Sequence, residues 1–168
     1  PRVVDSTGLL ALDTLPRRLC VIGAGVIGME FASVFQRFGT EVTVIEYLKE
    51  CLPALDSDIA KRLRKTLEKR GITFRMKTAV QDIADIDADV ILMATGRKPR
   101  LQPDFANAGF DYDTRTGIHV DDNMQTTVPG IYAIGDVNGR QMLAHAAEAQ
   151  AKVAVAHILQ SSHAEANS

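Results

Sequence analysis

Residues 23–28 read Gly-Ala-Gly-Val-Ile-Gly, a G-x-G-x-x-G run set between a short apolar segment and a helical pattern. The segment before it, Leu19–Ile22, has the length and apolar character of a buried strand that stops at a glycine. The segment after it, Val26–Phe38, carries apolar side chains at helical spacing, and Gly39 follows where a helix would end. Glycines at this spacing between a strand and a helix strongly favour a βαβ unit.

The spacing of the glycines fits a turn that approaches a bound phosphate group. Gly23 permits the tight turn, Gly25 lets the backbone come close to a pyrophosphate, and Gly28 allows helix and strand to pack closely. A helix starting at Val26 would also present unpaired N–H groups to the phosphates. The alternative interpretation is that the glycines serve a tight strand–helix turn and nothing else.

An acidic residue about 20 positions further on completes this dinucleotide-binding fingerprint. Glu46 stands 21 residues after Gly25, at the end of a strand predicted over Glu41–Glu46. A carboxylate there would accept hydrogen bonds from both hydroxyls of the adenosine ribose and repel a 2′-phosphate. The pattern therefore predicts NAD in preference to NADP. A solvated strand end is the alternative interpretation of Glu46.

The remaining periodicity continues the alternation of strands and helices. Asp56–Asp58 offers N-caps for a helix that Arg70 and Gly71 close. Further strands are predicted over Ile72–Met76 and Asp89–Ala94. This order is typical of parallel sheets with right-handed crossovers. We therefore predict an α/β fold, a Rossmann-type βαβαβ parallel sheet with helices on both faces.

The composition of the sequence changes after the last of these strands, where glycines and prolines become frequent. The predicted organisation is an irregular lead-in segment at 1–17, a nucleotide-binding domain at 18–95, a second region at 96–160 and a disordered tail at 161–168. Within the second region, short strands are predicted over Ile118–Val120 and Ile131–Ile134, and an alanine-rich helix over Gln141–Gln160.

Composition narrows the possible functions further. With 19 basic and 21 acidic residues, the net charge of −2 argues against a surface that coats nucleic acid. The apolar runs are strand-length, so no membrane span is predicted. Cys20 and Cys51 match neither a metal-ligand nor a C-x-x-C spacing, and no metal site is predicted. We expect a cytoplasmic protein, and since the sequence does not begin with Met, a piece of a longer chain.

Several segments in this order resemble one known family, the pyridine nucleotide–disulfide oxidoreductases. The segments that carry the resemblance are 21–30, 41–46, Ala94–Pro99 and Pro129–Asp136. Leu52–Asp56 and Met142–His145 are most similar to the members that oxidise dihydrolipoamide. On this resemblance, residues 18–95 form the NAD-binding domain and residues 96–160 the C-terminal portion of the FAD domain.

The resemblance also implies roles for individual residues. The residues expected to bind NAD are Gly23, Ala24, Gly25, Val26, Ile27, Gly28, Met29, Glu30, Glu46, Val80 and Gly96. Within this set, Val80 would lie on the adenine side and Gly96 would contact the cofactor through its backbone. The residues expected near FAD are Asp136, which would bind the ribityl chain, and a helix start against the flavin formed by Met142, Leu143, Ala144 and His145. An ordinary turn and an ordinary helix start are the alternatives for these two segments.

Some features of the family are absent from this sequence. The redox-active Cys-x4-Cys pair, the first G-x-G-x-x-G motif and the C-terminal dimerisation domain with its His–Glu pair do not occur in it. Between Val80 and Ala88, where the family usually has a three-stranded β-excursion, the sequence has only Gln81–Asp87. Cys20 and Cys51 do not replace the missing pair, so the chain is expected to contain no catalytic residue and to be inactive by itself.

The resemblance implies a parent protein that carries electrons from dihydrolipoamide through a cysteine pair and FAD to NAD⁺, and that forms a homodimer. This chain, without the parts it would pack against, is expected to self-associate. An NADH oxidase or peroxidase and a mercuric reductase share the same architecture and remain alternatives. A non-catalytic NAD-binding module is a further alternative, although the expected flavin half-site argues against it.

Overall fold

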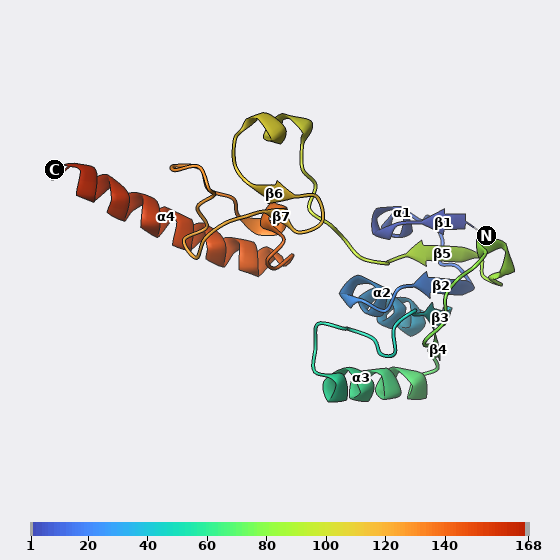
Figure 1. The fold of residues 1–168 in the computed structure, drawn as a ribbon. Coiled ribbons are helices and arrows are strands. Elements are labelled where there is room, and N and C mark those ends of the chain that lie inside the picture. The colour runs from blue at the N-terminus through green and yellow to red at the C-terminus, as the bar shows by residue number, and fades with distance from the viewer. Residues whose placement is uncertain (1, 167–168) are drawn as a thin grey trace. The chain divides into compact units, whose positions relative to one another are not determined.

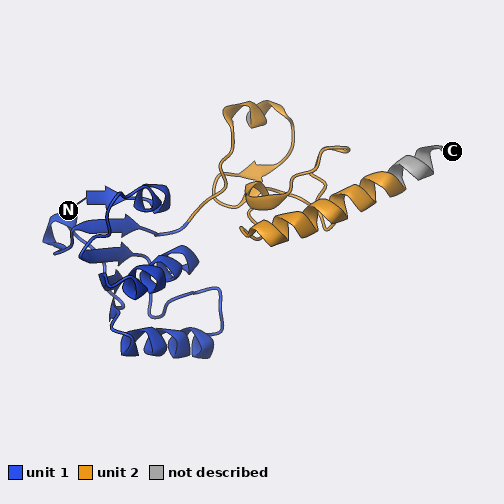
Figure 2. Ribbon diagram, turned by 180° about the vertical axis from the view of Figure 1, so that it is seen from behind, with its two compact units in different colours: residues 1–96 blue, residues 97–168 orange. Residues whose placement is uncertain are grey.

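The computed structural model describes residues 2–166 and gives side-chain surroundings for residues 2–105 and 107–160. The chain divides into two compact units, Pro1–Gly96 and Arg97–Ser168, which Figure 2 shows in different colours. The first unit holds the glycine-rich turn, and the second holds the segment expected near a flavin.

The first unit is built on a five-stranded, fully parallel sheet in the order β1-β5-β2-β3-β4 (Figure 1). The strands are β1 Arg2–Val4, β2 Arg18–Ile22, β3 Glu41–Ile45, β4 Thr73–Arg75 and β5 Val90–Met93. The pairing of β2 with β3 runs from Arg18 opposite Glu41 to Ile22 opposite Ile45. The predicted parallel α/β sheet is confirmed.

Helices cover one face of this sheet, and a shorter connection covers the other. The helices are α1 Ser6–Leu10, α2 Val26–Arg37 and α3 Ser57–Lys69. Helix α1 connects β1 to β2, α2 connects β2 to β3, and α3 connects β3 to β4, and all three connections run in the same direction along the strand order. Because such crossovers are right-handed, the three helices lie on one face of the sheet. The chain returns from β4 to β5 in the reverse direction and must cross the opposite face. There it forms one 3-10 turn, η1 Ile83–Asp85, where the sequence had predicted a face covered by helices.

Successive side chains of each strand point to opposite faces of the sheet, so the core is divided into two clusters, one on each face. Leu19 and Val21 of β2 belong to the large apolar cluster, together with buried residues of α1, α2 and α3. Cys20 and Ile22 point the other way, into a smaller cluster that Ile83 and Ile86 help to cover. Burying an aliphatic side chain of this kind stabilises the fold by about 1.5–3 kcal/mol. Most of this burial lies on the helix side.

The lead-in segment has regular structure where the sequence predicted none. Strand β1 pairs with β5 at the edge of the sheet, from Arg2 opposite Val90 onward. Asp5 then caps α1, its side chain accepting a hydrogen bond of 2.8 Å from the N–H of Gly8. Both elements are too short to show a periodicity, and the edge strand depends on β5, which is distant in sequence.

The second unit contains short elements and one long helix. These are η2 Pro103–Asn107, β6 Tyr112–Asp113, β7 Gly117–Ile118, η3 Gly135–Asn138 and α4 Ala144–Ala166. The predicted strand over Ile131–Ile134 is wrong, because within it only Tyr132 forms an isolated bridge, to Gln125. Helix α4 continues through residues 161–166, where a disordered tail was expected, and residues 167–168 lie outside the described part of the chain.

Apolar side chains of the second unit are exposed along α4 and before it. They include Ile134, Leu143, Val155, Ile158 and Leu159, with exposed fractions between 41% and 57%. Its small core is formed by Phe110, Ile118 and Ala133 with their neighbours. Exposed apolar side chains such as those of α4 favour contact with another protein surface.

Within residues 2–166, no helix combines the length and the apolar character needed to span a membrane.

We predict that the isolated chain self-associates through residues 96–168. The reason is that the exposed apolar side chains of α4 gain burial in a second copy. Light scattering behind a sizing column should give a mass above that of the 18.3 kDa chain at micromolar concentration. Replacing Val155 and Leu159 together by Lys should shift the protein toward monomer. A monodisperse monomer of the unmodified chain would contradict this prediction.

Candidate functional site

A cleft of about 720 Å³ opens at the carboxyl ends of the central strands of the first unit. Five residues predicted from the sequence line it, namely Gly23, Gly25, Glu46, Val80 and Gly96. Ligands of open α/β sheets bind at this edge, outside the carboxyl ends of the strands. The volume is within the usual range for small-molecule sites.

The cleft also contains residues that the sequence analysis did not single out. Tyr47, Leu48, Thr78 and Thr95 line it, each shortly after the end of β3, β4 or β5. Their position directly after predicted strands is the feature of the sequence by which they could have been found. Because their residue types indicate no chemistry, they could not be predicted as site residues from residue type alone.

Each glycine of the turn meets a different steric demand. Gly23 has a φ of +103°, and a Cβ on it would lie 2.3 Å from the carbonyl oxygen of Ala94. A Cβ on Gly28 would lie 2.1 Å from the carbonyl oxygen of Gly23. A Cβ on Gly25 would meet no atom of the described chain within 4 Å. Gly23 and Gly28 are therefore required by packing, whereas Gly25 leaves space beside the cleft.

The start of α2 provides the positive end of a helix at this turn. Gly25 is the N-cap, and the amide of Met29 donates back to its carbonyl oxygen over 2.9 Å. The glycine supplies no side-chain cap, and the first turn of α2 carries no acidic residue. The early N–H groups and the helix dipole thus favour an anion at this position.

Glu46 is nearly buried, and both of its carboxylate oxygens accept backbone hydrogen bonds. Oε2 accepts from the N–H of Ala24 over 2.7 Å, and Oε1 accepts from the N–H of Leu48 over 2.8 Å. Each oxygen has further lone-pair capacity for a ligand hydroxyl. The Glu46 carboxylate, which is predicted from the sequence to bind a ribose, is therefore also hydrogen-bonded to the glycine turn. Residue spacing alone could not predict this hydrogen bond.

The other residues of the predicted NAD set lie along the turn and α2. Ala24, Gly28 and Met29 are buried, Ile27 is half-buried, and Val26 and Glu30 are exposed. Val26, Met29 and Glu30 line a separate apolar groove of about 990 Å³ formed by α1, α2 and α3 with the loops beside them. Val26, Met29 and Glu30 do not line the cleft beside Gly25 and Glu46 in the first unit.

Both cysteines are free and buried, Cys51 in the large apolar cluster and Cys20 in the smaller one. Burial raises the pKa of Cys20 to about 11. Burial, and then the nearby Glu50, raise the pKa of Cys51 to about 11 as well. The Cys51 thiol donates to the carbonyl oxygen of Ala60 over 3.5 Å. Because the thiolate is the reactive form, neither side chain is suited to thiol chemistry near neutral pH.

The residues expected near a flavin lie at one end of α4 in the second unit. Asp136 is exposed on η3, which packs against the helix, since Gly135 lies beside Ala147. The buried Gln150 fixes this turn by accepting from the N–H of Gly135 over 2.7 Å and from the Asn138 side chain over 2.9 Å.

Among the four residues predicted at the helix start, Met142 is half-buried, whereas Leu143, Ala144 and His145 are exposed. Helix α4 begins at Ala144, which places Met142 and Leu143 just before its first turn. Within the described residues, no group of three or more His, Cys, Asp or Glu side chains could hold a metal ion.

Comparison with known proteins gives a consistent result. The family model described as pyridine nucleotide-disulphide oxidoreductase matches residues 1–151. The chain is 40% identical to the dihydrolipoyl dehydrogenase of Acholeplasma laidlawii, in a match that covers 98% of the chain and 52% of that protein. It is 40% identical to the leghemoglobin reductase of Glycine max over 167 residues, which covers 88% of the chain and 32% of that protein. The chain thus spans about half the length of the first of these relatives and about a third of the second.

Solved structures show the same likeness. A Cu(II) complex of the HOCl-induced flavoprotein disulfide reductase RclA from Escherichia coli superposes with a TM-score of 0.83 at 34% identity, over 91% of this chain and 39% of that one. LpdA from Mycobacterium tuberculosis gives a TM-score of 0.84 at 27% identity, over 94% and 38%.

Exchanging two glycines of the turn for alanine should have different effects on folding. Gly28→Ala places a methyl group against the Gly23 carbonyl, and we expect it to lower the free energy of unfolding by about 1–3 kcal/mol or more. Gly25→Ala enters open space with φ at −73°, and we expect a smaller loss of about 0.5–1 kcal/mol, because alanine is a poorer N-cap than glycine. Urea unfolding measures the free energy of unfolding of both variants. Equal losses would contradict the conclusion that packing requires Gly28 but not Gly25.

The buried thiols should react slowly with Ellman's reagent in the folded protein at pH 8. With a pKa of about 11, each thiol is almost entirely protonated at that pH, and burial also limits access. The same protein unfolded in urea serves as the control, in which both thiols should react at once. Rapid stoichiometric labelling of the native protein would show that a thiolate is present and accessible.

Proposed function

Since the chain belongs to the pyridine nucleotide-disulphide oxidoreductase family, we propose that its first unit binds NAD(H) in the cleft beside Gly25 and Glu46. The single observation that carries this proposal is the geometry of the glycine turn. Packing requires Gly23 and Gly28, whereas the absent side chain of Gly25 leaves space beside the cleft. A turn that served packing alone would place no demand on a third glycine there.

The cleft fits the chemistry of a dinucleotide. The amides at the start of α2 would hold the pyrophosphate, and Glu46 would accept from the adenosine ribose hydroxyls with its remaining lone pairs. Val80 lies in the same cleft on a connection that would face the adenine, and Gly96 would offer its backbone. When bound, NAD⁺ supplies the chemistry by accepting a hydride, and the chain's own residues bind and orient it.

We further propose that the second unit contributes part of an FAD site. Asp136 is exposed on a turn that Gln150 holds rigidly, and the start of α4 lies beside that turn. An exposed carboxylate can accept hydrogen bonds from ribityl hydroxyls, and a helix N-terminus favours an electron-rich ring system. These residues would reach only part of a flavin dinucleotide.

The longer protein to which such a chain would contribute is proposed to be a flavoprotein disulfide oxidoreductase that oxidises dihydrolipoamide with NAD⁺ as a homodimer. Support comes from relatives named dihydrolipoyl dehydrogenase at about 40% identity. This chain's share of the reaction is binding, orientation and electrostatics, so we propose that it does not turn over alone. Reduction of NAD⁺ by dihydrolipoamide, assayed with the full-length protein, tests the substrate.

The cofactor preference tests the proposal for the cleft. We expect NADH to bind at least about tenfold more tightly than NADPH, because a 2′-phosphate would meet the Glu46 carboxylate. Glu46→Gln should narrow this ratio, and the exposed Glu41→Gln on the same strand should leave it unchanged. Fluorescence titration of the purified chain with both cofactors measures the ratio. Equal affinities in the unmodified chain would refute the role of Glu46.

The chain alone should bind FAD weakly or not at all. Asp136 and the start of α4 would contact the ribityl chain and the ring, whereas the pyrophosphate of FAD would lack a second glycine turn. The absorbance spectrum of the protein as purified, followed by titration with FAD, provides the measurement. Stoichiometric flavin in the purified chain would contradict the prediction.

A further inference from the structure

The backbone of Ala24 in the glycine turn is held by two hydrogen bonds, one to its N–H and one to its carbonyl oxygen. Its N–H donates to Oε2 of Glu46, and its carbonyl oxygen accepts from the N–H of Leu52 over 2.8 Å. Leu52 belongs to the loop 47–55, which follows β3 and contributes Tyr47, Leu48 and Pro53 to the cleft. The position of the glycine turn therefore depends on the position of this loop.

The loop has a conformation that needs external support. Leu52 has a φ of +49°, a left-handed value that is unfavourable for a branched side chain. Both Cys51 and Leu52 are nevertheless buried, with exposed fractions of 1% and 6%. A strained segment persists only where its surroundings fix it. Contacts outside the loop must therefore supply the constraint.

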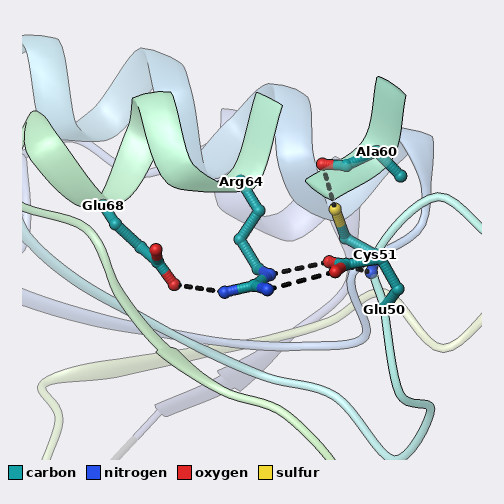
Figure 3. A network of polar contacts seen from close by, with 5 residues as sticks. All are labelled: Glu50, Cys51, Ala60, Arg64 and Glu68. Carbon is teal, nitrogen blue, oxygen red and sulfur yellow. Dashed lines mark hydrogen bonds and ion pairs between the residues drawn. The ribbon is translucent and has the colours of Figure 1, made fainter. Parts of the chain in front are cut away.

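A two-pronged ion pair to α3 supplies it, as Figure 3 shows. Arg64 donates from Nε to Oε1 of Glu50 over 2.7 Å and from a terminal nitrogen to Oε2 over 3.1 Å. A further nitrogen of the guanidinium contacts Glu68, one turn along the helix. Glu50 in turn accepts from the N–H of Cys51, and the Cys51 thiol reaches the carbonyl oxygen of Ala60.

This pair differs from an ordinary surface ion pair. The side chains of Arg64 and Glu50 are only 18% and 20% exposed, and the bidentate geometry fixes the orientation of both groups. The hydrogen bonds from Arg64 hold the pKa of Glu50 below its usual range, so the carboxylate is charged at neutral pH. A lysine could not reproduce the paired hydrogen bonds.

We propose that Arg64 and Glu50 are positioning residues of the dinucleotide cleft. They hold the loop 47–55 on α3, so that the Leu52 amide fixes the carbonyl group of Ala24 and the glycine turn keeps its pyrophosphate-binding shape. The inference rests on the proposed NAD(H) site, and it assigns that site two residues that do not line the cleft.

The experiment uses the whole chain with the variants Glu50→Gln, Arg64→Met and Arg64→Lys. The matched control is Arg62→Met, an exposed arginine on the same helix. Titration with NADH gives the affinity, and hydrogen exchange followed by NMR gives the protection of the Ala24 and Leu52 amides. The amides of Leu19 and Val21 in β2 report on global opening.

We expect Glu50→Gln and Arg64→Met to weaken NADH binding about tenfold, the lower end of what loss of charge-assisted hydrogen bonds costs. Exchange at Ala24 and Leu52 should accelerate by a similar factor, while exchange in β2 stays unchanged. Arg64→Lys should recover part of both effects, and Arg62→Met should change neither.

Other outcomes overturn the proposal. Equal acceleration at all four amides would mean that the pair stabilises the fold in general. Unchanged NADH affinity despite faster exchange at Ala24 and Leu52 would mean that the cleft does not depend on the loop. If the unmodified chain binds no NADH, the proposed function fails, and the exchange rates still decide whether the pair holds the glycine turn.

Discussion

The contact between Gly28 and the carbonyl oxygen of Gly23 is the constraint on which the site depends. It brings the first turn of α2 against the end of β2 so closely that a methyl group would lie 2.1 Å from that oxygen. This approach lets α2 begin shortly after the carboxyl end of β2. The cleft and the helix N-terminus follow from that one packing requirement.

Glu46 then joins separate parts of the chain through one carboxylate. It directly follows β3, accepts from the amide of Ala24 in the glycine turn and accepts from the amide of Leu48 in the following loop. A nearly buried carboxylate is costly unless it is hydrogen-bonded, and the two amides meet that need. The same group can therefore be tolerated in the fold and remain beside a ligand cleft.

The sequence predicted those parts of the structure whose signals are local. The glycine spacing, the strand before it and the helix after it were enough to place Gly23, Gly25 and Glu46 along one cleft. Strand β1 was missed because three residues show no periodicity and pair only with the distant β5. The Ala24–Glu46 hydrogen bond could not be predicted either, because its geometry depends on how the turn and β3 pack together.

The connection from β4 to β5 serves both the core and the cleft. The chain must cross the face of the sheet opposite the helices there, and η1 with its neighbours provides the cover. Val80 and Ile83 pack against the smaller core cluster and also line the cleft. The residues that close the core on this face are thus among those that shape the site.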